Sequence, residues 1–129
     1  MSRSTTPITW FEIGTDRPED AERFYEELFG WTFEEQGSTN GGSYRVTGAG
    51  GDTGIGGAIR ATDGTSPNYA VFYAEVADVA EACRHAEAAG GKVLVPVRTA
   101  PSGLTLAHLL DPAGNRLGVF APPPVATGD

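Results

Sequence analysis

Apolar residues recur along the chain with two spacings that alternate in a fixed order. Segment 8–13 is β-branched and aromatic and stops at Gly14, which predicts a strand. A helix is predicted next, with Asp16 as its cap, Glu19 completing a capping box and Gly30 at its end. Its apolar residues lie three and four positions apart, at Ala21, Phe24, Tyr25, Leu28 and Phe29.

Three short strands are predicted after this helix, at 31–36, 43–47 and 55–61, separated by loops 37–42 and 48–54. They complete a first series of elements, and the same order then occurs a second time. A polar link at 62–67 leads to the second series. The second series comprises a strand at 69–76, a helix opened by Asp78 and Glu81, and strands at 93–98, 104–110 and 116–121.

A constant offset of 61 residues relates the two halves. It aligns Phe11 with Phe72, and Gly57 with Gly118. Internal repetition constrains topology as well as local structure. We therefore predict an α+β fold with two tandem β-α-β-β-β modules, 7–61 and 68–121, within one domain spanning 1–121. The tail 122–129 has little that could pack, and we expect it to be disordered.

Charge and cysteine usage limit the function. The 17 acidic and 9 basic residues give a net charge of −8, which repels phosphate backbones and anionic membranes. We therefore expect neither a nucleic-acid nor a membrane partner. The single cysteine, Cys83, excludes an intramolecular disulfide and favours a reducing compartment. With no apolar run near the N-terminus, a cytoplasmic location is predicted.

Two motifs on this repeat point to a known family. Segment 24–31 reads FYEELFGW, and 111–115 reads DPAGN in a tight turn. With the order of elements, they resemble the glyoxalase, bleomycin-resistance and extradiol-dioxygenase superfamily, called vicinal oxygen chelate. The resemblance implies that each module curls its sheet and that the two sheets form a U-shaped cleft around a ligand. It also implies a homodimer.

The resemblance places the metal ligands of metal-dependent members on the first and last strand of each module. Those positions here are Trp10 and Val71 on the first strands, and Gly57 and Gly118 on the last. None of these side chains can donate an electron pair to a metal. We therefore predict a metal-less branch of the superfamily with no cofactor. No metal role is assigned to His85 or His108.

Alternation along the strands then predicts the inner wall of the cleft, since residues two apart share a face. The predicted ligand-binding residues are Trp10, Glu12, Ile55, Gly57, Ile59, Tyr69, Val71, Tyr73, Arg116, Gly118 and Phe120. Tryptophan and glycine in place of metal ligands should make the cleft roomier and more aromatic. Plainer alternatives exist: Trp10 plugs the cleft as core, Glu12 is exposed at a strand end, and Arg116 faces solvent.

These features predict a metal-independent protein that binds a small molecule. The expected ligand is large and aromatic or cationic, such as an antibiotic that the protein sequesters. One alternative is an enzyme of the superfamily, a lyase, isomerase or oxygenase, with Glu12 or a cleft tyrosine such as Tyr73 as acid or base. A metal enzyme with relocated ligands and a structural or regulatory module are two others. No catalytic residue is assigned.

Overall fold

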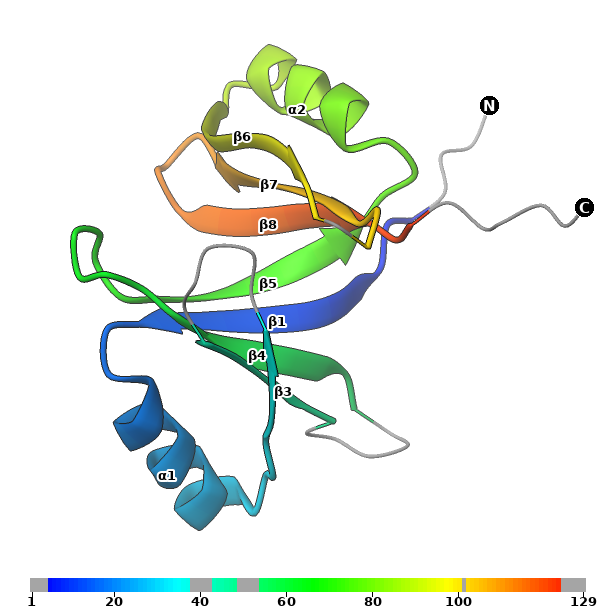
Figure 1. Ribbon diagram of the computed structural model, residues 1–129. Coiled ribbons are helices and arrows are strands. Elements are labelled where there is room, and N and C mark those ends of the chain that lie inside the picture. Colours follow the sequence, from blue (N-terminus) through cyan, green and yellow to red (C-terminus); the bar gives the residue numbers. More distant parts are fainter. Residues whose placement is uncertain (1–4, 38–42, 49–53, 101, 124–129) are drawn as a thin grey trace, which may run out of the picture. The chain divides into compact units, whose positions relative to one another are not determined.

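The computed structural model describes residues 5–37, 43–48, 54–100 and 102–123, and it confirms the predicted α+β order of elements (Figure 1). The first series is β1 (Ile8–Thr15), α1 (Pro18–Phe29), β2 (Glu34–Gly37), β3 (Ser43–Thr47) and β4 (Gly56–Ala61). The second is β5 (Tyr69–Glu75), α2 (Val79–Ala88), β6 (Lys92–Thr99), β7 (Thr105–Leu110) and β8 (Arg116–Ala121). Most of the predicted loops at 37–42 and 48–54, and of the tail 122–129, lie outside the described residues.

The chain divides into two compact units, and the division falls inside β5. The first unit is Thr9–Phe72, and the second joins Met1–Ile8 to Tyr73–Asp129. In the first unit the strands lie in the order β2-β3-β4-β1, with β1 and β4 parallel and the other pairs antiparallel. In the second unit the order is β5-β8-β7-β6, with β5 and β8 parallel.

The pairing of β1 with β4 corrects the predicted inner face of β4. Trp10 lies beside Gly56, and Glu12 lies beside Ala58. Residues paired in this way share a face of the sheet, so Gly57 lies on the opposite face. A methyl group added to Gly57 would meet the Phe11 ring at 2.3 Å, as expected for that face. The prediction that Ile55, Gly57 and Ile59 share a face with Trp10 and Glu12 was therefore wrong.

Helix α1 begins later than predicted and buries less. Its first residue is Pro18, and the N-cap is Arg17, with no side-chain cap. The predicted capping box of Asp16 and Glu19 was therefore wrong, because proline sets the first helical position. None of its residues is buried. Trp31 stacks on Tyr25, with ring centroids 5.6 Å apart, in place of starting the next strand.

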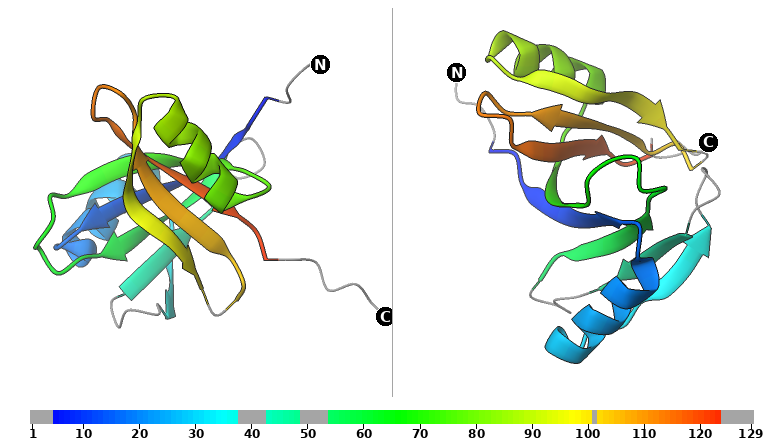
Figure 2. Two further views of the ribbon diagram at one scale, coloured as in Figure 1. Left: turned by 90° about the horizontal axis from the view of Figure 1, so that it is seen from above. Right: turned by 90° about the vertical axis from the view of Figure 1, so that its left-hand side faces the viewer.

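Helix α2 lies over the sheet of its unit (Figure 2), and buried residues of the helix and the sheet form one core. The buried core residues are Val79, Cys83, Ala107, Leu109, Val119 and Ala121. Asp78 caps α2 as predicted, accepting a hydrogen bond from the Glu81 amide at 3.0 Å. Burial raises the pKa of the Cys83 thiol, which makes this cysteine a poor nucleophile. Neither described helix is long and apolar enough to span a membrane.

Candidate functional site

A buried carboxylate lies at the centre of a polar cluster in the first unit. The Glu12 side chain is only 2% exposed. The Tyr69 hydroxyl donates to Glu12 Oε2 at 2.5 Å, and Arg60 Nε lies 3.4 Å from the same oxygen. A methyl group at Gly14 would meet the Tyr69 ring at 2.2 Å, so the tyrosine reaches Glu12 by lying against the bare backbone there. The alternative of Glu12 exposed at a strand end was wrong.

Two aromatic residues extend this cluster. The Arg60 guanidinium lies 4.8 Å from the centroid of the Tyr44 ring, and Trp10 Nε1 donates to the Tyr44 hydroxyl at 3.3 Å. Burial raises the pKa of Tyr44, and the negative charge of Glu12 raises it further. Tyr44 is therefore a neutral hydroxyl near neutral pH. We call Trp10, Glu12, Tyr44, Arg60 and Tyr69 the carboxylate cluster.

A second polar cluster lies in the second unit, on three adjacent strands. Tyr73 on β5 and His108 on β7 both pair with Gly118 on β8, one from each side. The Tyr73 hydroxyl is hydrogen-bonded to His108 Nε2. Tyr73 and His108 are each 3% exposed, and Arg116 Nε donates to His108 Nδ1 at 2.8 Å. We call Tyr73, His108 and Arg116 the tyrosine–histidine cluster.

The absence of a side chain at Gly118 allows this contact. A methyl group there would lie 2.6 Å from the Tyr73 ring, far inside van der Waals distance. The ring therefore crosses β8 directly over the glycine to reach the imidazole. Gly118 has a structural role that its residue type alone does not indicate.

The arginine fixes the proton positions of the cluster. A guanidinium has only donors, so Nδ1 of His108 must be the acceptor in its contact with Arg116. Imidazolium has no acceptor nitrogen, and His108 is therefore neutral with its proton on Nε2. Nε2 then donates to the Tyr73 oxygen. The phenolic hydrogen of Tyr73 must point away from the imidazole.

The positions that the resemblance assigns to metal ligands carry side chains that donate no electron pair to a metal. Tyr73 corresponds to Glu12 at the offset of 61. On the last strand of each module, Tyr73 pairs with Gly118 and Glu12 pairs with Ala58. The first-module counterpart of Gly118 is therefore Ala58. A methyl group offers no ligand either. No group of three or more His, Cys, Asp or Glu residues that could hold a metal ion occurs in the described part of the chain.

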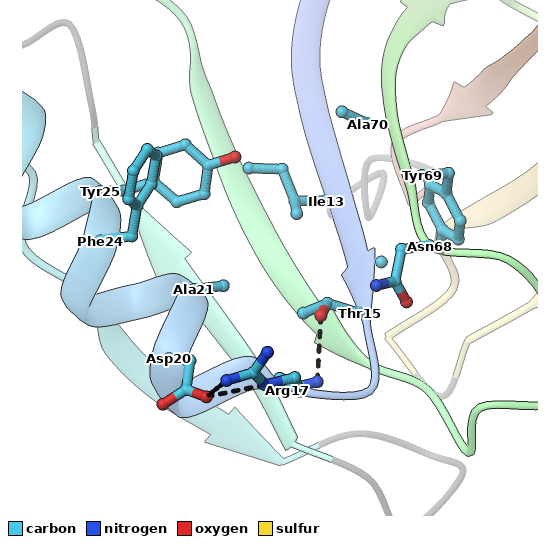
Figure 3. A pocket seen from close by; sticks show the side chains of 11 residues that line it. Ile13, Thr15, Arg17, Asp20, Ala21, Phe24, Tyr25, Asn68, Tyr69 and Ala70 are labelled. Carbon is cyan, nitrogen blue, oxygen red and sulfur yellow. Dashed lines mark hydrogen bonds and ion pairs between the residues drawn. The ribbon is translucent and has the colours of Figure 1, made fainter.

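A separate pocket of about 520 Å³ lies in the first unit between α1 and the ends of β1 and β5 (Figure 3). Its apolar wall includes Ile13, Phe24 and Tyr69. At one edge, Thr15 Oγ1 accepts from the Arg17 amide at 3.0 Å, while the Arg17 side chain is paired with Asp20. Of the predicted ligand-binding residues, only Tyr69 lines this pocket.

The structure thus places some of the predicted site residues in the two clusters and the others outside them. Trp10, Glu12 and Tyr69 join the carboxylate cluster, while Tyr73 and Arg116 join the tyrosine–histidine cluster over Gly118. Phe120 has its ring centroid 6.1 Å from that of Tyr73, and Val71 is buried. Ile55, Gly57 and Ile59 belong to neither cluster. Their roles in ligand binding, like the U-shaped cleft, stay predictions.

Sequence reasoning missed Tyr44, Arg60 and His108. Alternation could have found His108, because it lies beside Gly118 in an antiparallel pair and so shares its face. Arg60 was missed because of the error in β4, where it shares the face of Ala58 and Glu12. For Tyr44, no feature of the sequence fixed the pairing of β3 with β4.

Comparison with known proteins defines the class to which this fold and these clusters belong. The family model of the Glyoxalase/Bleomycin resistance protein/Dioxygenase superfamily matches residues 8–119. The chain therefore belongs to this superfamily, as the resemblance predicted.

Particular relatives are found among curated proteins and solved structures. "Putative glyoxylase CFP32" of Mycobacterium bovis and of Mycobacterium tuberculosis are each 35% identical over 124 residues, which are 96% of this chain. The chain spans only 47% of their length. The M. tuberculosis methylmalonyl-CoA epimerase structure has a TM-score of 0.63 at 14% identity, covering 91% of this chain and 88% of its own. A hypothetical protein from Bacillus halodurans has a TM-score of 0.70 at 10% identity, covering 97% of this chain and 100% of its own.

These comparisons bear on the predicted functions. The solved structures show the fold alone, because their identity is low. None of these relatives is named as an antibiotic-binding protein, and antibiotic sequestration therefore has no support from them. Their names fit the enzymatic alternative better.

Proposed function

We propose that this chain is an enzyme of the superfamily that transfers a proton to or from a small carbonyl compound without a metal. Tyr73 is the proposed proton donor, and His108 and Arg116 hold it in position. The observation that carries the proposal is the chain of contacts from Arg116 Nε through His108 to the Tyr73 hydroxyl. Buried, oriented donors of this kind are typical of acid–base sites.

The contacts favour loss of the Tyr73 proton to a substrate. When the phenol gives up its hydrogen, the phenolate oxygen keeps the hydrogen bond donated by His108 Nε2. Arg116 is hydrogen-bonded to Nδ1, on the other side of the His108 imidazole, and its positive charge stabilises the phenolate as well. Both groups are in place before the proton moves, so little reorganisation is needed. The proton returns to Tyr73 from the substrate when the reaction is reversed, or from solvent before the next cycle.

Glu12 is a second candidate acid–base group, and it belongs to the first unit. It occupies in the first module the position that Tyr73 occupies in the second, and it is held by Tyr69 and Arg60. A carboxylate can accept a proton next to a carbonyl group, as a general base does. We test the two residues separately, so that the role of either one can fail alone.

The curated relatives support an enzymatic function over sequestration. Each is named "Putative glyoxylase CFP32" and matches nearly the whole of this chain. Because the match covers about half of their length, their activity is transferred only as part of this proposal. One of the named structures is a methylmalonyl-CoA epimerase, and its likeness to this chain is one of fold.

Hydrogen exchange at carbon tests the proposal directly. The purified protein is incubated in D2O with α-branched acyl thioesters and with hemithioacetals of 2-oxoaldehydes, and NMR follows loss of the C–H signal. We expect exchange with at least one compound, unchanged by EDTA. Tyr73→Phe should lower the rate by about 100-fold or more, the usual range for loss of a general acid. Tyr25→Phe, on α1, is the matched control.

Other outcomes distinguish the roles. His108→Gln should lower the rate less than Tyr73→Phe and change its dependence on pH, because His108 positions the phenol. If Glu12→Gln abolished exchange and Tyr73→Phe did not, Glu12 would be the essential residue and the role assigned to Tyr73 would be wrong. No exchange with any compound, together with quenching of tryptophan fluorescence by glycopeptide, anthraquinone, flavin or polyketide ligands, would replace the proposal with sequestration.

A further inference from the structure

The pocket beside α1 lies outside the two polar clusters and shares only Tyr69 with them. Its volume of about 520 Å³ is within the range of small-molecule sites in proteins. All its lining residues lie between Ile13 and Ala70, so it belongs to the first unit alone. Figure 3 shows Phe24 on α1 and Tyr69 on β5 at opposite sides of the pocket, with Ile13 between them. Aromatic side chains therefore bound this space on two sides.

The internal repeat explains why the first module has a space between its helix and its sheet. In the second module, Cys83 on α2 and Ala107 on β7 are both buried in the core between the helix and the sheet. At the offset of 61, the first-module equivalent of Cys83 is Glu22. The pairing of β3 with β4, and of β7 with β8, makes Arg45 the equivalent of Ala107. The first module therefore has two charged side chains where the second has a small apolar contact.

These two charged side chains form an ion pair that keeps α1 away from the sheet. Glu22 Oε1 lies 3.0 Å from Arg45 Nε, and the two side chains are 27% and 12% exposed. Side chains of this length require more room between a helix and a sheet than a cysteine and an alanine do. Accordingly, no residue of α1 is buried, whereas Val79 and Cys83 of α2 are buried. Since a gap persists where its surroundings cannot relax into it, the ion pair keeps the pocket open.

The polar groups at the rim of the pocket restrict what it can bind. The side chains of Arg17 and Asp20 are paired at 2.6 Å, so their charges compensate each other. Asn68 Oδ1 accepts a hydrogen bond from the Asp16 amide at 3.3 Å. None of the described residues accepts a hydrogen bond from Asn68 Nδ2, which is therefore available as a donor to a ligand. The rim thus offers one neutral donor beside charges that are already paired.

We propose that this pocket binds a small neutral aromatic molecule that carries one hydrogen-bond acceptor, such as an aryl ketone. The ring of the ligand lies between Phe24 and Tyr69, and its carbonyl oxygen accepts from Asn68 Nδ2. Aromatic pairs attract each other beyond the effect of buried area, whereas burying an ion here would remove its hydration without supplying an opposite charge. This site does not rest on the proposed proton transfer, whose donor Tyr73 belongs to the other unit.

An NMR titration of the backbone amides of the whole chain tests this site with four matched probes. Acetophenone has both the ring and the acceptor, ethylbenzene lacks the acceptor, benzoate is an anion and benzylammonium is a cation. We expect saturable binding of acetophenone with a Kd of about 1 mM or tighter, an affinity that a ligand of this size can reach. The two ions should bind at least about 5-fold more weakly. The amides that shift should lie at 13–24 and 68–70, around the pocket.

Three variants test the walls and the donor separately. Asn68→Asp keeps the acceptor for the Asp16 amide and removes the donor, so it should weaken acetophenone binding about 5-fold, the effect of one neutral hydrogen bond, and leave ethylbenzene binding unchanged. Ala21→Phe fills the pocket and should abolish binding of both probes, and Ala80→Phe, at an exposed position of α2, is its matched control. Phe24→Ala removes one wall without adding bulk and should weaken both probes about 5-fold. Circular dichroism confirms that each variant is folded.

Three results would overturn the proposal. The first is a set of shifts that rise linearly up to the solubility limit of acetophenone, since they indicate no specific site. The second is tighter binding of benzoate or benzylammonium than of acetophenone, which would contradict the neutral ligand class. The third is acetophenone binding that survives Ala21→Phe, because the ligand would then lie elsewhere. Failure of the protein to exchange hydrogen at carbon would leave all these measurements unchanged, since the probes bind without reacting.

Discussion

Replacing Arg60 with methionine should destabilise the protein by about 3 kcal/mol. The substitution leaves Glu12, which is 2% exposed, without the cation 3.4 Å from its oxygen. Breaking a buried ion pair costs about 3–5 kcal/mol, and the 25% exposure of the Arg60 side chain places this pair at the lower end. For 129 residues, the unfolding entropy is about 0.27 kcal/mol/K, so Tm should fall by about 11 °C.

The carboxylate charge is the cause, and a second substitution can isolate it. Glu12→Gln removes the charge and keeps an oxygen that can accept from Tyr69. In that background, Arg60→Met should cost only about 1 kcal/mol, mostly from its lost contact with Tyr44. The double-mutant cycle should therefore give a coupling of about 2 kcal/mol. Arg98→Met, on an exposed arginine, should change stability by less than about 0.5 kcal/mol.

Urea unfolding at pH 7 measures the four free energies. If Arg60→Met cost the same in both backgrounds, Arg60 would stabilise the fold through packing alone. In that case the charge of Glu12 would not depend on Arg60, and the conclusion that Arg60 stabilises the Glu12 carboxylate would be refuted.

Three further predictions concern other parts of the chain. Gly118→Ala should cost about 1–3 kcal/mol in urea unfolding, because its methyl group would overlap the Tyr73 ring; Gly48→Ala, which meets nothing within 4 Å, is its control. Asp78→Ala removes the cap of α2 and should lower the free energy of unfolding by about 1 kcal/mol. Absorbance at 295 nm should show Tyr44 ionising above its ordinary pKa of 10, a transition absent in Tyr44→Phe. Since the folded-state pKa is raised, the stability contributed by neutral Tyr44 should be present below pH 10 and lost as pH rises through the raised value.

The sequence predicted the order of elements because each one has a strong local pattern. The cap Asp78, the strand β8 and the turn at 111–115 depend on residues close together in the chain. Helix α1 shows the limit of such reasoning. Asp16 and Glu19 have the spacing of a capping box, but Pro18 between them takes the first helical position, and the structure uses Arg17 as the cap.

The candidate site was only partly predictable because it depends on strand register. The constant offset of 61 aligns Gly57 with Gly118. The strand pairing shows instead that Ala58 is the first-module equivalent of Gly118. This shift of one residue in the last strand of the first module moves every side chain of that strand to the other face. The sequence offers no sign of it, because both candidate positions are small. Arg60 was left off the predicted inner face for this reason, and Ile59 was wrongly placed on the face of Glu12.

The glycines at these positions also have a different effect from the one predicted. Replacing a metal ligand by glycine was expected to make a cleft roomier. Within the second unit, the space above Gly118 is filled by the Tyr73 ring, which would contact even a methyl group there. In the first unit, the Tyr69 ring lies in the same way against Gly14 and reaches Glu12. The small residues thus serve to bring tyrosine hydroxyls to a histidine and to a carboxylate. If these hydroxyl contacts are what the small residues provide, Gly118→Ala should reduce hydrogen exchange as strongly as Tyr73→Phe while leaving the ionisation of Tyr44 unchanged.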